Sequence, residues 1–149
     1  MMTSDNRLLD QDTILNALTH HLHSREEIVF AYAHGSLVDG LVPYRDVDVA
    51  VYVRPEWVQA HQDKTLAYVL SLSTELILAL REEIGLRVPV DVQMLNEAPL
   101  PFRMHVVRDG RLLFTHDEEL LADFIEYTAR RYMDMAPLWR EYTKELIRP

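Results

Sequence analysis

The chain has 149 residues, of which 48% are hydrophobic and 26% charged, a composition typical of one globular domain. Its net charge of −9 repels a phosphate backbone, so nucleic acid is not expected as the main partner. No apolar run reaches the roughly 20 residues of a membrane helix, no secretory signal is visible, and the absence of cysteine fits a cytoplasmic location.

The first part of the chain predicts a helix followed by two strands. Apolar residues recur every three or four positions over 8–23, which is the period of an amphipathic helix. Residues 27–34 form a short apolar and aromatic run of strand length that ends at Gly35, and a short helical turn and a loop follow. The next run alternates valines with other residues and predicts a strand over 46–53. Its two faces carry Val47, Val49, Val51 and Val53 on one side and Asp46, Asp48, Ala50 and Tyr52 on the other.

A long helix and a third strand are predicted next. Helical periodicity extends over 63–84, and Gly85 is a suitable C-terminal stop. The apolar segment 86–95 has the length of a strand, and Pro89 places its beginning or an edge of the sheet there.

The last part of the chain predicts a helix, a fourth strand and a helical tail. Asp109–Gly110 is a turn signal directly before the apolar run 111–115, which we interpret as a strand. From Asp117 onward the sequence is helical, with acidic residues in its first turn. Pro137 is expected to break or kink this helix before a last short helix through Leu146.

This order of elements predicts a fold of the α/β (α+β) class, in which helices pack on a small mixed β-sheet of about four strands. Internal repeats and linkers are not visible in the sequence. We therefore expect a single domain over 1–149 that includes a C-terminal helical tail over about 117–149.

Three aspartates in otherwise apolar strands are candidate metal ligands. Asp46 and Asp48 project from the same face of a strand roughly 7 Å apart, so their carboxylates can converge on one or two hard cations. Two divalent ions need a further carboxylate to offset their repulsion, and Asp91 fits because we place its strand beside the first acidic one. The alternatives are a solvated strand end for the first two acids and a capped or paired buried acid for Asp91.

Gly35 and Ser36 lie where a strand ends and a helical turn begins. Free backbone N–H groups at such a position bind anionic oxygen. Glycine lets the backbone approach a phosphate closely, and the Ser36 hydroxyl can add a hydrogen bond. The pair therefore suggests a triphosphate site, although a Gly-Ser dipeptide taken alone is merely a turn in most proteins.

Other polar side chains are weaker candidates. His34 is adjacent to Gly35 and could face a nucleotide, but a hydrogen-bonded structural histidine is favoured. Tyr44, in the loop before the acids, could touch a substrate or accept a modification. A zinc site is not favoured, because neighbouring histidines on a helix point in different directions; the histidines concerned are His20, His21 and His23.

The order of these motifs resembles that of the nucleotidyltransferase superfamily with the polymerase-beta-like fold. Here Gly35–Ser36 is followed by nine residues, then by Asp46-Val47-Asp48 and later by Asp91. Within that superfamily, the short chain, the segment "VPVDVQMLNEAPLPFRMHVVRDGRLLF" and the helical tail are similar to the minimal nucleotidyltransferase (MNT) antitoxins of HEPN/MNT toxin–antitoxin systems. Many family members carry Ala-Arg-Gly after the Gly-Ser; this chain has "LVDG", with Arg45 as a substitute charge.

The resemblance implies magnesium-dependent transfer of AMP from ATP to a tyrosine of a partner HEPN ribonuclease toxin, which is thereby silenced. Gly35 and Ser36 would bind the triphosphate, Asp46 and Asp48 would hold the two magnesium ions, and Asp91 would complete the metal site and help to activate the attacking hydroxyl.

Two other functions stay open. One is a non-catalytic antitoxin that occludes the toxin while its nucleotide site is vestigial. This function would use an apolar stripe of the tail, which could equally be core; the stripe consists of Leu138, Trp139, Tyr142 and Leu146. The other function is nucleotide transfer to a small molecule such as an aminoglycoside.

Overall fold

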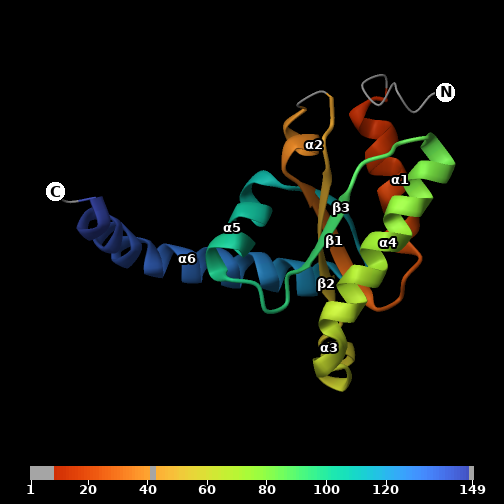
Figure 1. Ribbon diagram of the computed structural model, residues 1–149. Coiled ribbons are helices and arrows are strands. Elements are labelled where there is room, and N and C mark those ends of the chain that lie inside the picture. The colour runs from red at the N-terminus through yellow and green to blue at the C-terminus, as the bar shows by residue number, and fades with distance from the viewer. Residues whose placement is uncertain (1–8, 41–42, 148–149) are drawn as a thin grey trace.

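The computed structural model describes residues 9–40 and 43–147, and Figure 1 shows how its elements are arranged. In chain order these are α1 (Gln11–His23), β1 (Ile28–His34), α2 (Ser36–Asp39), β2 (Val47–Val53), α3 (Pro55–Ala60), α4 (Thr65–Ile84), β3 (Val90–Met94), α5 (Leu100–Asp109), β4 (Arg111–Thr115) and α6 (Glu118–Ile147). The predicted order of helices and strands is confirmed as far as the start of the helical tail. The short helix α3 was not predicted, although its first residue, Pro55, is a common helix-starting residue.

Local signals set the ends of the two helices that pack on the core. At the start of α1, the Asp10 side chain accepts a 2.7 Å hydrogen bond from the Thr13 N–H, so the helix begins at Gln11. The predicted start at Leu8 lies outside the described residues. The predicted start of α4 at Asp63 falls in a 3₁₀ turn, and the α-helix begins two residues later. The predicted stop is confirmed, because Gly85 caps α4 with φ 69°.

The four strands form a mixed sheet in the order β3-β2-β1-β4. β1 is antiparallel to both of its neighbours, whereas β2 and β3 run parallel to each other. The registers align His34 with Asp48 and Asp48 with Asp91. The two acidic strands are therefore neighbours, as predicted, and Asp48 and Asp91 lie side by side at one end of the sheet.

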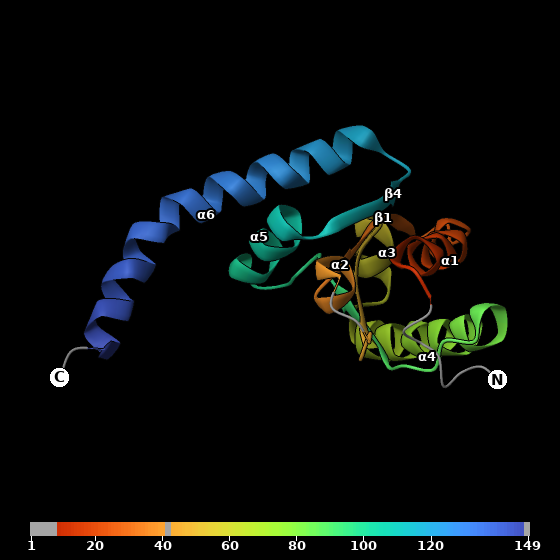
Figure 2. The same ribbon diagram turned by 90° about the horizontal axis from the view of Figure 1, so that it is seen from above.

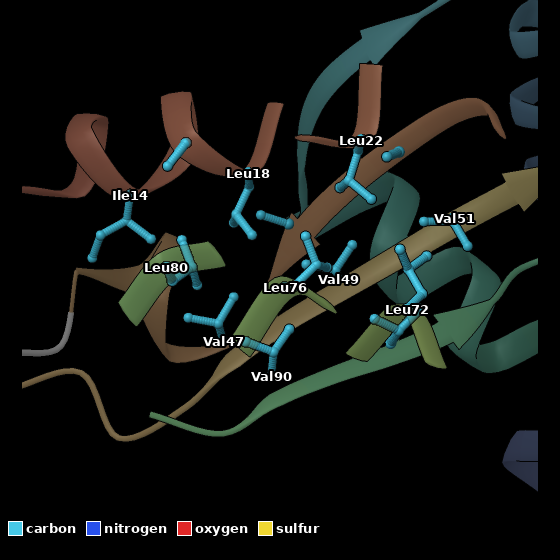
Figure 3. Close-up of a cluster of buried hydrophobic side chains, with 14 of the residues drawn as sticks. Ile14, Leu18, Leu22, Val47, Val49, Val51, Leu72, Leu76, Leu80 and Val90 are labelled. Carbon is cyan, nitrogen blue, oxygen red and sulfur yellow. The ribbon is translucent and has the colours of Figure 1, made fainter. Parts of the chain in front are cut away.

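One face of the sheet is covered by α1 and α4 (Figure 1). The predicted valine face of β2 points into this layer, and each fully buried side chain of this size stabilises the fold by about 1.5–3 kcal/mol. Figure 3 shows the interlocked side chains, which are Ile14, Leu18 and Leu22 of α1, Leu72, Leu76 and Leu80 of α4, and Val47, Val49, Val51 and Val90 of the strands.

The opposite face of the sheet packs against α5 and the first half of α6 (Figure 1). Phe30 of β1 is fully buried there and stacks on Tyr52 of β2, with ring centroids 4.8 Å apart. Phe124 of α6 closes the cluster with its centroid 5.4 Å from that of Phe30. The aspartates lie on this same face, beyond the end of the apolar cluster.

The C-terminal tail is one helix of 30 residues, α6, so the expected division into two helices is wrong. The helix continues through Pro137 and curves away from the sheet (Figure 2). Proline removes one backbone hydrogen bond, but the carbonyl that it leaves free lies on an exposed helix and can be hydrated, so the helix bends without ending. Within residues 9–40 and 43–147, no helix is both long enough and apolar enough to cross a bilayer.

Candidate active site

The site is built around a tight turn at the end of β1. Gly35 has φ 78° and ψ −152°, a conformation that is strained for any residue with a side chain. A Cβ atom at this position would lie 2.6 Å from the Oδ2 atom of Asp48. The absence of a side chain at Gly35 therefore lets the backbone approach the carboxylate closely.

Ser36 links the same turn to the other acid of the pair. Its Oγ atom donates a hydrogen bond of 3.4 Å to Oδ1 of Asp46, which directly precedes β2. Gly35 thus lies against Asp48, and Ser36 is hydrogen-bonded to Asp46. The structure brings these four residues together across the nine-residue loop, as the sequence motif predicted.

Asp91 lies next to Asp48 on the neighbouring parallel strand. Adjacent strands are about 4.8 Å apart, so the two side chains project side by side from one face of the sheet. Asp48 is half-buried, whereas Asp91 is exposed. The Oδ2 atom of Asp91 accepts a hydrogen bond from the Gln93 side-chain amide, which lies one pleat further along the same face.

Behind the acids, Gln93 also holds a buried histidine. Its Oε1 atom accepts a 3.0 Å hydrogen bond from Nε2 of His34, whose side chain is 6% exposed and lies edge-on to the ring of Phe102. This confirms the structural role favoured for His34. The bridging role of Gln93 was not foreseen, although its position two residues after Asp91 on a strand already placed both side chains on one face.

The site accumulates negative charge. Burial raises the pKa of Asp48 above its ordinary value, and the negative charges of Asp46 and then Asp91 add to this effect, while His34 opposes it. A carboxylate with a raised pKa, lying among further acids, gains stability when a cation neutralises it. The electrostatics therefore favour a cation between the strands.

The donor set fits magnesium, since three carboxylates supply the hard oxygen ligands that this ion prefers. Within the described part of the chain, no three His, Cys, Asp or Glu side chains converge closely enough to hold an ion as they stand. Two of the acids are hydrogen-bonded elsewhere, Asp46 to Ser36 and Asp91 to Gln93, and would have to turn toward an ion. The assignment of Asp46, Asp48 and Asp91 as metal ligands stays a prediction.

The weaker candidates lie away from these acids or at their margin. Tyr44 is 5% exposed and packs in the core between the sheet and the helices α1 and α4, which is incompatible with a substrate contact. The side chain of Arg45 is exposed beside the acids, and residues 41–42 of the same loop lie outside the described residues. Of the three histidines of α1, His21 pairs with Glu83 and lies edge-on to His20, while His23 packs against Phe114.

Comparison with known families gives one match. The family model described as polymerase beta, nucleotidyltransferase, matches residues 16–119, which contain every predicted site residue. A search of curated protein sequences finds no significant match.

Several solved structures share the fold. A chain of the tri-AMPylated Shewanella oneidensis HEPN toxin in complex with MNT antitoxin aligns with a TM-score of 0.69 at 20% identity, over 93% of this chain and 99% of that one. The toxin–antitoxin MntA-HepT gives a TM-score of 0.63 at 18% identity, over 93% and 97%. A toxin–antitoxin structure with AMP-PNP gives 0.62 at 20% identity, over 94% and 100%.

Proposed function

Because the chain belongs to the polymerase beta nucleotidyltransferase family, we propose that it is an MNT-type antitoxin that transfers AMP from ATP to a tyrosine of a HEPN-type toxin and so neutralises it. The observation that carries the proposal is the contact of Gly35 and Ser36 with Asp48 and Asp46, beside Asp91. The structural neighbours support the protein acceptor, since one of them contains an AMPylated toxin and another an ATP analogue.

In this proposal Gly35 and Ser36 bind the triphosphate, because the glycine leaves the backbone open and the serine hydroxyl can turn from Asp46 to a phosphate oxygen. Asp46, Asp48 and Asp91 hold two magnesium ions, which when bound offset the negative charge of the phosphates. Asp91 is the exposed acid, so it also accepts the proton of the attacking hydroxyl. The cytoplasm supplies ATP and magnesium, and we place the reaction there.

The reaction is a single in-line displacement. The phenolic oxygen attacks the α-phosphorus, the bond between this phosphorus and the oxygen that bridges it to the β-phosphorus breaks, and pyrophosphate leaves. Since positioning and charge neutralisation supply most of the catalysis in phosphoryl transfer, loss of either acid of the Asp-x-Asp pair should be severe.

The test is a transfer assay with a HEPN-type partner protein, co-expressed and purified with this chain, in the presence of magnesium and ATP. Mass spectrometry should find AMP on a tyrosine of that partner. Asp46→Asn and Asp48→Asn should abolish the adduct while the circular dichroism spectrum is kept, and Glu56→Gln, an exposed acid on α3, should leave it intact. An Asp variant with full activity, or no adduct on partner or chain although ATP binds, would exclude the proposal.

One observation favours the second candidate function, a binding antitoxin that blocks its toxin without chemistry. In the outer half of α6, Leu138, Tyr142 and Leu146 are 61%, 65% and 68% exposed, and their spacing places them on one side of the helix. These three members of the predicted stripe are therefore surface, whereas the fourth, Trp139, is half-buried and packs against Tyr132. If the double variant Asp46→Asn/Asp48→Asn still neutralised the toxin in cells, occlusion would replace transfer as the function.

A further inference from the structure

A pocket of about 570 Å³ lies along the free edge of β3. It extends from the first turns of α4 to the first turn of α5, the two helices that flank β3 in Figure 1. Most of its lining is apolar and includes Leu66, Val92, Met94 and Phe102, while Gln93 and Glu97 are among its polar residues. Leu66 at its rim is 70% exposed and so offers an apolar side chain to a ligand there.

Gln93 links the pocket to the candidate active site. This side chain lines the pocket and donates a hydrogen bond to Asp91, so one side chain separates the pocket from that carboxylate. Phe102 connects the two regions in the same way, because it lines the pocket and packs against His34.

The order of the strands fixes the sides from which the two substrates approach. Gly35 follows β1, Asp48 is on β2, and Asp91 is on β3, whose other edge pairs with no strand among residues 9–40 and 43–147. In an in-line displacement the attacking oxygen and the leaving pyrophosphate lie on opposite sides of the phosphorus. If the triphosphate is held at Gly35 and Ser36, the attacking hydroxyl arrives from the side of Asp91 and the pocket.

We propose that this pocket is the acceptor site and that it binds the aromatic side chain to be modified together with apolar neighbours on the partner polypeptide. The inference rests on the proposed function and specifies its acceptor as a protein segment. The phenolic oxygen bonds to the α-phosphorus, pyrophosphate carries away the electron pair of the broken bond, and the phenolic proton passes to Asp91.

The lining argues for a polypeptide and against an aminoglycoside. An aminoglycoside carries several positive charges, and burying them requires several carboxylates. The pocket lining holds one acid, Glu97, which is exposed, and most of the remaining surface is aliphatic or aromatic. Such a surface suits a tyrosine ring, which is an apolar body with a single polar atom.

The experiment compares two exposed leucines of α4. Leu66→Arg adds a charged side chain at the pocket rim, while Leu78→Arg makes the same change on a leucine that is 49% exposed and lies about 18 Å further along the helix. Transfer to the HEPN-type partner is measured over ranges of partner and of ATP concentration. We expect Leu66→Arg to raise the KM for the partner at least about tenfold, the effect of losing one interface anchor, with the KM for ATP unchanged. Leu78→Arg should match the wild type.

Two results would overturn the inference. An unchanged KM for the partner in Leu66→Arg would show that the acceptor binds elsewhere. A raised KM for ATP with an unchanged KM for the partner would make the pocket a nucleobase site.

A crosslinking arm separates the inference from the proposed function, because it needs no transfer. Leu66 and Leu78 are replaced in turn by p-benzoylphenylalanine, and each protein is irradiated with the purified HEPN-type partner. Capture from position 66 and not from position 78 supports the pocket even if the wild type attaches no AMP. Capture from position 78 alone contradicts it even if AMP is attached.

Discussion

Substitution of Gly35 should affect both the stability of the fold and the candidate active site. Gly35→Ala adds one methyl group, and two effects oppose it. The backbone at φ 78° and ψ −152° costs a non-glycine residue about 1–3 kcal/mol. In addition, the new Cβ would lie 2.6 Å from Oδ2 of Asp48, so either the turn or the carboxylate must move. We expect a loss of unfolding free energy of about 2–4 kcal/mol, together with loss of nucleotide transfer.

Gly85→Ala is the matched control. Gly85 also has a positive φ, 69°, but nothing lies within 4 Å of a Cβ atom built there. This variant should lose only the cost of left-handed backbone, about 1–2 kcal/mol, and should keep its activity. The measurement is urea unfolding followed by circular dichroism, with metal-dependent ATP binding measured on the same samples.

A double-mutant cycle isolates the steric effect of the new methyl group on the Asp48 carboxylate. If the methyl group acts by displacing the carboxylate, Gly35→Ala should cost less in an Asp48→Ala background than in the wild type, because only the backbone strain remains. Equal costs in the two backgrounds, or a Gly35→Ala variant as stable and as active as Gly85→Ala, would refute the contact as the reason for glycine at this position.

Three further predictions concern stability and the site. Because the folded state raises the pKa of Asp48 above its unfolded value of 3.8, the folded protein binds more protons between these two values, and the metal-free protein should lose stability as the pH rises through that interval. At pH 7 the free energy of unfolding of Asp48→Asn should therefore exceed that of the wild type, by less than about 1 kcal/mol because solvent still screens this side chain. Below pH 3.8 the two proteins should be equally stable. Urea unfolding in the presence of EDTA measures both differences. Thr128 is fully buried, and its Oγ1 atom has no hydrogen-bond partner in the described chain, so Thr128→Val should raise the urea midpoint by the equivalent of about 1 kcal/mol without changing activity. Gln93→Leu should lower the unfolding free energy by about 1–3 kcal/mol, because it leaves the His34 ring nitrogen buried and unpaired and removes the donor to Asp91; urea unfolding measures the loss.

The sequence was sufficient to predict the faces of β2 and the adjacent positions of the strands that carry Asp48 and Asp91. The alternation along β2 assigned its valines to the core and its aspartates to the opposite face, because the side-chain period of a strand leaves no other arrangement. It also predicted that the strand of Asp91 would lie beside that of Asp48, and the parallel register confirms this. These features depend on local periodicity and on the cost of burying unpaired charge, which can both be judged from the sequence.

Other features depend on contacts between distant segments and could not be predicted in this way. Tyr44 lies in a loop, and only the packing of α1 and α4 against the sheet shows that its ring is buried. Pro137 normally ends a helix, but α6 is solvated there and can bend. In the sequence, Gln93 is an ordinary polar residue of an edge strand. Only the structure shows that its side-chain amide is hydrogen-bonded to both His34 and Asp91.

The arrangement of β2 also explains how a domain of this size can maintain a strained and highly charged site. Its inward-facing valines pack against α1 and α4, so the position of Asp48 is set by the core and not by attraction among the acids, which repel one another. The raised pKa of Asp48 and the backbone of Gly35 are both unfavourable in the free protein. A cation bound with a triphosphate would relieve the charge repulsion, so ligand binding should stabilise this end of the sheet more than the remote end at α3. Hydrogen exchange with and without magnesium and ATP measures this difference directly, and equal protection of both ends would place the ligand elsewhere.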